Sequence, residues 1–230
     1  MIISVHQPQY IPWLGYFDKI ARSDAFVFLD NVQYKPREFQ NRNKIRAKDG
    51  WLWLSVPVIS KGKGRQVISD VRIDNELDWP KEHLMSLKTC YGRAKFFDRY
   101  FPYFEDLYGK PWESLAGLNI DIIKYILKDL SISTPLYFES DLKVTTTKTE
   151  RITDICRVPN ADAYLSGAGG KAYIDEDKFT ASGLKLSYQD FSHPVYAQQF
   201  MKTEGDFMPF MSIADLLFTE GPRAKEVLKI

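Results

Sequence analysis

Two short apolar segments near the amino terminus constrain the fold of this chain more than any other feature. Residues Ala25-Phe26-Val27-Phe28-Leu29 form an uninterrupted apolar run that ends at Asp30-Asn31, which is typical of a strand buried on both faces of a parallel sheet. Ile2-Ile3-Ser4-Val5 predicts an earlier strand, and apolar spacing over residues 14–22 predicts a helix between the two. Strand, helix and strand within so short a stretch indicate a βαβ unit and therefore an α/β fold.

Further strand and helix signals follow along the chain. We expect strands over 134–138, 162–165 and 184–188, a helix over 147–156, and terminal helices over 215–218 and 223–228. Residues 51–58 and 67–73 predict a hairpin, whose basic loop at 60–65 is either a lid over a phosphate or a solvated turn. Three scaffold helices are expected over 79–130, with His83 at a surface or half-buried position.

These signals predict one α/β domain over residues 1–230. Its parallel-sheet core carries an inserted hairpin and a helical subsidiary lobe at about residues 51–130.

Charge and composition argue against several classes of partner. The chain has 31 Lys and Arg against 30 Asp and Glu, so a net charge of +1 gives no bulk attraction to nucleic acid or to a membrane. The amino terminus lacks a signal-peptide pattern, and no apolar run approaches the roughly 20 residues that span a bilayer, so we expect a cytoplasmic protein. Cys90 and Cys156 have neither metal-ligand nor disulfide spacing, so no metal site is expected.

The first cluster of candidate site residues follows the first predicted strand. Pro8 and Pro12 cannot donate to a sheet ladder, so irregular backbone begins directly after His6. Ligands of open α/β sheets bind beyond the carboxyl ends of the strands. His6 is therefore a candidate catalytic base, with Gln7 and Tyr10 as substrate-binding groups. The alternative is that His6 merely hydrogen-bonds a turn carbonyl.

A second cluster follows the second predicted strand. Its amides could bind a sugar or nucleotide, and its two cations could bind phosphate; alternatively, the Asn and Asp residues only shape turns. The candidate substrate-binding residues here are Asp30, Asn31, Gln33, Asn41, Arg42, Asn43 and Lys44, which we expect to lie in a loop.

Two more clusters follow later strands. Glycines let backbone N–H groups approach an anion, so we expect substrate contacts from a glycine loop, although its spacing is not that of a P-loop. The loop residues concerned are Ser166, Gly167, Gly169, Gly170 and Lys171. His193, after the strand at 184–188, is either a second acid/base group or a turn histidine.

Three segments of the sequence resemble the WbqC-like family of bacterial proteins. They are the run from His6 to Ile20, HQPQYIPWLGYFDKI, then Asn41-Arg42-Asn43-Lys44-Ile45, and finally Tyr164-Leu165-Ser166-Gly167. The resemblance covers nearly the whole chain. It implies a role in building bacterial surface polysaccharide such as O-antigen, with acyl or aminoacyl transfer to a nucleotide-activated amino sugar as the favoured reaction.

A weaker similarity concerns the adenylyl- and cytidylyltransferases, whose first strand also ends at a histidine. The sequence has His6 alone where that superfamily has an H-x-G-H pair, which argues against nucleotidyl transfer while leaving a nucleotidyltransferase-type sheet as the expected core.

The sequence leaves three functions open: acyl transfer, nucleotidyl transfer, and a non-catalytic sugar- or carrier-binding module. For acyl transfer, the expected partners are a nucleotide sugar and an acyl-thioester donor, either coenzyme A or an acyl carrier protein. A homodimer is compatible with the sequence, and a resident cofactor is not implied.

Overall fold

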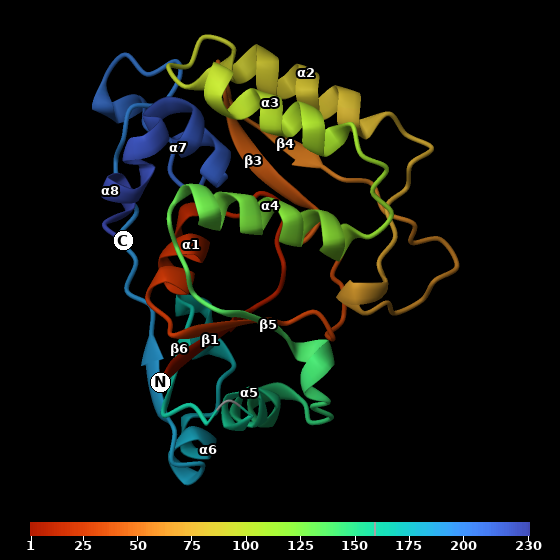
Figure 1. Cartoon of the computed structure of the whole chain (residues 1–230), viewed down its shortest axis with the longest axis vertical. Helices are drawn as coiled ribbons and strands as arrows, with labels where there is room; N and C mark the ends of the chain where they lie inside the picture. Colours follow the sequence, from red (N-terminus) through yellow and green to blue (C-terminus); the bar gives the residue numbers. More distant parts are fainter. Residues whose placement is uncertain (159) are drawn as a thin grey trace.

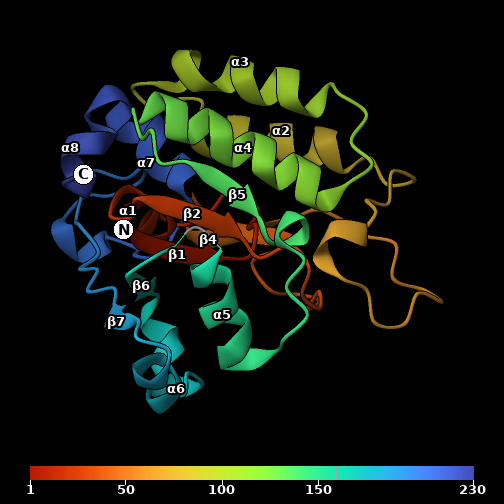
Figure 2. The ribbon, with the colours of Figure 1, turned by 60° about the horizontal axis from the view of Figure 1, so that its bottom comes forward.

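Five parallel strands form the central sheet of the computed structural model, which describes residues 1–158 and 160–230. In spatial order they are β5 (Leu136–Phe138), β2 (Ala25–Phe28), β1 (Ile2–His6), β6 (Ala163–Ser166) and β7 (Lys185–Tyr188). Every neighbouring pair is parallel, which confirms the expected fold class. Along the chain, β2 and then β5 are added on one side of β1, and β6 and then β7 are added on its other side. The direction of strand addition therefore reverses between β1 and β6 (Figure 2).

Helices cover both faces of the sheet (Figure 1). One face packs against α1 (Leu14–Ala21) and α4 (Leu115–Asp129), and the other against α5 (Lys148–Arg157) and α6 (Glu176–Ala181). Phe26 and Phe28 point into the first core and Val27 into the second, because successive strand residues face opposite sides. Burial of all four β2 residues explains why that segment is apolar without alternation.

The hairpin differs from the prediction. It pairs β3 (Arg42–Ala47) with β4 (Gly50–Ser55), whereas residues 67–73 contain a 3₁₀ turn, Ile68–Asp70, and meet residue 58 only through one isolated bridge. The sequence analysis did not predict strand β3, because most of its residues are polar. In the structure, Asn43 and Ile45 are buried on one of its faces.

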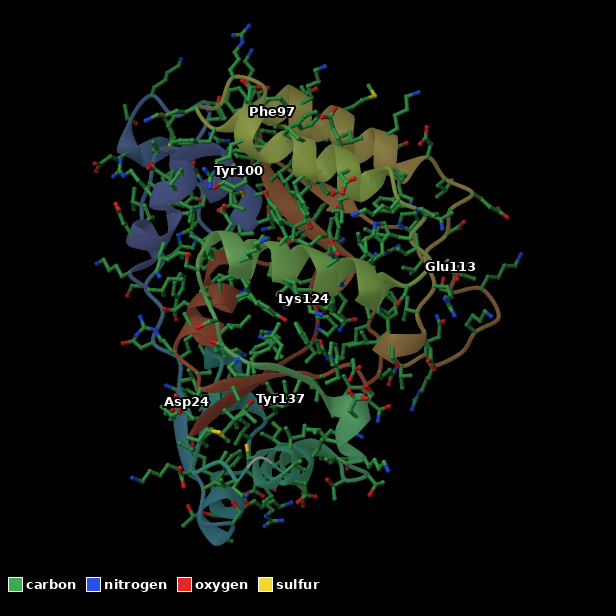
Figure 3. All side chains as sticks on the ribbon, in the orientation of Figure 1. Asp24, Phe97, Tyr100, Glu113, Lys124 and Tyr137 are labelled. Carbon is green, nitrogen blue, oxygen red and sulfur yellow. The ribbon has the colours of Figure 1, made fainter. Side chains whose placement is uncertain are left out.

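The first core also takes buried residues from α2 (Trp79–Tyr91), α3 (Phe97–Tyr108), α7 (Ile213–Glu220) and α8 (Ala224–Leu228). Phe97 and Tyr100 of α3, labelled in Figure 3, bring their ring centroids within 5.8 and 6.3 Å of the Phe218 ring of α7. The carboxyl-terminal helix α7 is thereby part of the same core as the helical segment. In the described ranges, none of the helices is both long and apolar enough to cross a bilayer.

Buried amides hold the irregular turn that follows β1. The amide nitrogen of Asn43 donates to the carbonyl of Ile11 at 2.8 Å, and that of Asn119 donates to the carbonyl of Pro8 at 3.3 Å. Ile11 has a φ of 39°, an unfavourable value for a β-branched residue. The turn after His6 is thus fixed by side chains from β3 and α4.

Candidate functional site

A pocket of about 520 Å³ opens at the carboxyl ends of β1 and β6. His6 and Gln7 contribute from the end of β1, and Gly167, Gly169 and Gly170 from the loop after β6. The pocket therefore occupies the position where the strand order reverses, which is where open α/β sheets bind ligands. Two segments that the sequence analysis treated as separate clusters meet here.

The pocket has a cationic lining. Lys19, Lys35, Lys148 and Arg151 contribute to it, whereas its described lining residues include no aspartate or glutamate. Arg151 is partly neutralised, because its Nη1 lies 2.7 Å from Oε1 of the fully buried Glu139. Lys35 and Lys148 are exposed. This charge distribution suits a ligand that carries phosphate or carboxylate groups.

His6 is held at both ring nitrogens. Its Nδ1 lies 2.9 Å from Nζ of Lys19, its Nε2 lies 3.3 Å from the amide nitrogen of Gln9, and its ring packs 4.9 Å from that of Tyr16. Burial lowers the pKa of His6 well below its usual value, and the charge of Lys19 lowers it further. The imidazole is consequently neutral at physiological pH and able to accept a proton.

Lys19 is a functional candidate that the sequence analysis missed. It reaches from α1 beneath the end of β1, is only 2 % exposed, and donates to the carbonyl of Val5 at 3.1 Å. Burial lowers the pKa of Lys19 to about 7. The available signal was a lysine within a short helix that is apolar apart from Asp18 and Lys19 and lies between two buried strands, since such a position leaves little room for a solvated charge.

The glycine loop lies close to this pair. A Cβ at Gly167 would stand 3.8 Å from Nζ of Lys19, and one at Gly170 would collide with Ser166. Ser166 itself is buried and donates to the Gly167 carbonyl at 3.0 Å, so it shapes the loop. Lys171 does not line the pocket, because its Nζ lies 5.2 Å from the centroid of the Tyr188 ring.

Gln7 and Gln9 supply amides on either side of His6. Oε1 of Gln7 accepts a hydrogen bond from Gln40 at 2.6 Å, which leaves the Gln7 amide N–H groups as donors toward the pocket. Oε1 of Gln9 is buried and has no hydrogen-bond partner among the described residues.

The residues that directly follow β2 mainly shape its loop. The end of β2 lies beside the end of β1, with the N–H of Leu29 donating to the His6 carbonyl at 2.8 Å. The Asp30 carboxylate instead accepts hydrogen bonds from the backbone and hydroxyl of Ser140. Asn31 offers its carbonyl to Arg151, and the exposed Gln33 forms a bridge with residue 67.

Arg42 and Lys44 lie on strand β3, so the expected loop position was wrong. The Arg42 guanidinium stacks 4.2 Å from the centroid of the Trp53 ring, and Nζ of Lys44 lies 4.7 Å from that of Trp51. Strand periodicity places both cations on the solvent-facing side of the hairpin, outside the pocket lining.

Their amide neighbours on the hairpin are structural. Asn43 holds the turn after β1, as described above, and Asn41 donates to the Val56 carbonyl at 3.0 Å. The interpretation of these amides as turn-forming groups therefore accounts for their contacts.

Tyr10 and His83 form part of the core, which contradicts the surface or half-buried position expected for His83. The Tyr10 hydroxyl contacts Nδ1 of His83 at 2.8 Å and the hydroxyl of Tyr108, and Tyr10 is fully buried. Burial lowers the pKa of His83 to about 4, so its ring is neutral. Sequence spacing cannot reveal this contact, because 73 residues separate the two partners.

His193 lies at a different pocket, which is also lined by Asp18 and Asp190. Its Nε2 accepts from the backbone N–H of Phe210 at 3.1 Å, and its Nδ1 bonds the carbonyl of Pro194 at 2.9 Å. Both ring nitrogens are thus engaged by the protein backbone, and the structure does not bring His193 to His6. The turn-histidine alternative accounts for these contacts.

A family model and a relative of known sequence each match almost the whole chain. The model of the WbqC-like protein family matches residues 7–227. A relative from Mycobacterium tuberculosis strain H37Rv, the uncharacterized protein Rv1507c, is 34% identical over 228 residues, which are 99% of this chain and 97% of the relative. No solved structure matches the chain.

Proposed function

The chain belongs to the WbqC-like protein family, and from that premise we propose that it transfers an acyl or aminoacyl group to the amine of a nucleotide-activated amino sugar. The product would serve the synthesis of bacterial surface polysaccharide such as O-antigen. The observation that carries the proposal is His6, a neutral imidazole at the mouth of a strand-end pocket surrounded by cations.

His6 is the proposed general base. The sugar amine attacks the carbonyl carbon of an acyl thioester, a C–N bond forms, and Nε2 of His6 takes the proton that the nitrogen loses. The C–S bond then breaks, and the leaving thiolate recovers that proton. A neutral imidazole suits this step because only the unprotonated ring has a lone pair that can accept the proton.

The other pocket groups have matching roles. The free amide N–H groups of Gln7, or backbone N–H groups of the glycine loop, would stabilise the oxyanion of the tetrahedral intermediate. Lys35, Lys148 and Arg151 would hold the phosphates of the nucleotide sugar or of the donor. The proposal no longer uses His193, Arg42, Lys44 or Lys171, since none of them lines this pocket.

The test is a coupled assay of the purified full chain. We expect a nucleotide amino sugar and acyl-coenzyme A to yield free thiol and an N-acylated sugar that is heavier by the acyl group. His6→Ala should lower turnover about 10²-fold or more while the thermal transition is kept. Unchanged turnover in that variant would contradict the role of His6.

The assay also separates the two alternatives. Release of pyrophosphate from a nucleoside triphosphate, without thiol release, would replace acyl transfer by nucleotidyl transfer. Saturable binding of the nucleotide sugar with no turnover by any of a panel of coenzyme A and carrier-protein thioesters would favour a non-catalytic binding module.

A further inference from the structure

Lys19 has no role in the function proposed above, yet its Nζ lies 2.9 Å from Nδ1 of His6. We propose that Lys19 is the proton partner of His6: the two residues share a single proton, which moves to Nζ of Lys19 when Nε2 of His6 accepts one from the substrate. The inference rests on the proposed function only in taking His6 as the base. Lys19 is a positioning residue, since it acts through His6.

The contacts around the pair assign its hydrogens. When the amide nitrogen of Gln9, 3.3 Å away, donates to Nε2 of His6, Nε2 is an acceptor and Nδ1 carries the ring hydrogen. Nδ1 then donates to Nζ of Lys19, 2.9 Å away, which requires a free lone pair and hence a neutral amine. Nζ in turn donates to the Val5 carbonyl. These three contacts are mutually compatible when Lys19 is uncharged.

The surroundings allow only one positive charge on the pair. Nζ of Lys19 forms no ion pair with any carboxylate in ranges 1–158 and 160–230, and the lysine is almost fully buried. A protonated amine beside an imidazolium would place two charges 2.9 Å apart in a site with little water. Burial lowers the pKa of both Lys19 and His6, and the charge of Lys19 lowers that of His6 further.

The remaining titratable groups around the pocket add no nearby negative charge. The carboxylate of Glu139 is held by Arg151, and burial raises the pKa of Tyr16 and of Tyr164 well above neutrality. The other groups that face the pocket are the cations Lys35 and Lys148 and the phenol of Tyr173, whose pKa burial also raises. Of these groups, the cations Lys35 and Lys148 oppose a second proton on the pair, and the neutral phenols supply no charge that would favour one.

The proton movement follows from this arrangement. When Nε2 takes the proton released by the attacking amine, Nδ1 passes its own proton to the lone pair of Nζ. The imidazole ends neutral with its hydrogen on Nε2, and Lys19 ends as an ammonium ion. Reversal of both transfers returns the proton to the leaving thiolate. The imidazole thus relays the proton, and the positive charge forms on Lys19 rather than on the ring.

Burial argues against Lys19 as a nucleophile in its own right. Only 2 % of the residue is exposed, and its Nζ is engaged by Val5 and His6. A substrate carbonyl would have to displace both contacts to reach the amine, whereas a substrate that gives its proton to Nε2 of His6 displaces only the Gln9 amide.

The test is a pH titration of the full chain by NMR with ¹⁵N-labelled histidine. We expect His6 to carry its hydrogen on Nδ1 at pH 9 and, as the pH falls through about 7, to switch to Nε2 while the ring stays neutral. An ammonium ion can only donate, so protonation of Lys19 forces Nδ1 to accept. A Lys19 amine that stays protonated throughout this pH range would produce no change of tautomer.

Two variants and a control identify the partner. Lys19→Met should abolish the switch, and Lys19→Arg should hold the hydrogen on Nε2 at every pH because the guanidinium stays charged. Lys128→Met, on the exposed side of α4, should keep the wild-type switch. A single tautomer from pH 6 to 9 in wild type, or a switch that survives in either folded Lys19 variant, would overturn the proposal. The wild-type titration decides even if a variant does not fold.

This experiment is independent of turnover. A tautomer switch without acyl transfer would support the proton sharing between Lys19 and His6 and refute the proposed function. Acyl transfer without a switch would refute the role of Lys19 alone.

Discussion

Gly170 packs so tightly against Ser166 that a Cβ at Gly170 would overlap the serine hydroxyl and come within 2.9 Å of Cδ1 of Ile174. The neighbouring Gly169 differs, because no atom lies within 4 Å of the position that its Cβ would occupy. The two glycines form a matched pair for testing whether the loop must keep its shape.

We expect Gly170→Ala to destabilise the fold by about 1–3 kcal/mol, the usual cost of inserting a methyl group into a packed site. It should also weaken binding of nucleotide sugar, since relief of the clash would shift the loop at the pocket wall. Urea unfolding and calorimetric titration measure the two effects. Gly169→Ala should change stability by less than about 0.5 kcal/mol; equal losses in both variants would show that the crowding at Gly170 is not the cause.

The cationic lining predicts a graded loss of anion binding. Lys148→Ala and Lys35→Ala should each weaken nucleotide-sugar binding about 2- to 5-fold, the scale of a partly solvated charge contact, with a smaller loss at high salt. Lys128→Ala removes a comparable surface charge remote from the pocket and should leave the affinity unchanged. Arg151 is unsuitable for this test, because its loss would strand the buried carboxylate of Glu139. Salt-independent losses would exclude an electrostatic role.

Burial of Lys19 predicts a characteristic dependence of stability on pH. The pKa of its amine is about 7 in the folded chain and about 10.4 in the unfolded chain, so between these values the unfolded chain binds a proton that the native chain does not. Wild type should therefore gain stability relative to Lys19→Met as pH rises from about 7 to 10, by up to about 1.4 kcal/mol per pH unit. Below pH 7 the difference between the two should be constant.

Urea unfolding of both proteins at pH 6, 7, 8 and 9 checks this slope, and the difference cancels other groups whose pKa values the variant leaves unchanged. Lys128→Met against wild type should give a flat line over the same range. A flat line for Lys19→Met as well would mean that the folded chain leaves the pKa of the Lys19 amine at its ordinary value.

Tyr10 provides a test that separates core from site. Tyr10→Phe should cost about 1–3 kcal/mol because it leaves Nδ1 of the buried His83 without its partner, yet nucleotide-sugar affinity should not change. Thermal unfolding and calorimetric titration give the two values. Tyr137→Phe, on the exposed edge strand labelled in Figure 3, should have no measurable effect on either. If Tyr10→Phe instead weakened nucleotide-sugar binding and left stability unchanged, Tyr10 would be a substrate-binding residue and not a core residue.

Local pattern made the sheet and the place of the pocket predictable. The unbroken apolar run that became β2 could be interpreted without any partner, because a strand buried on both faces has no polar side. His6 and the glycine loop were recognisable because each directly follows a strand, and parallel strands bring their carboxyl ends to one edge.

The sequence analysis missed strand β3 and misplaced Arg42 and Lys44 for the same physical reason. Strand β3 is half polar in sequence, and it becomes a strand because β4 pairs with it and the core takes Asn43 and Ile45. Arg42 and Lys44 had the composition of a binding loop, but the register of that hairpin turned them outward, away from the pocket lining.

The sequence by itself therefore determined the α/β class, the parallel strands and the strand-end position of His6, since these depend on periodicity and on the order of neighbouring elements. Only the tertiary structure decided which charged and polar side chains are buried together. Lys19 meets His6 because α1 packs against β1, and Tyr10 meets His83 across 73 positions of the chain. The free energy of such a contact depends on desolvation by both partners, and no local pattern contains that quantity.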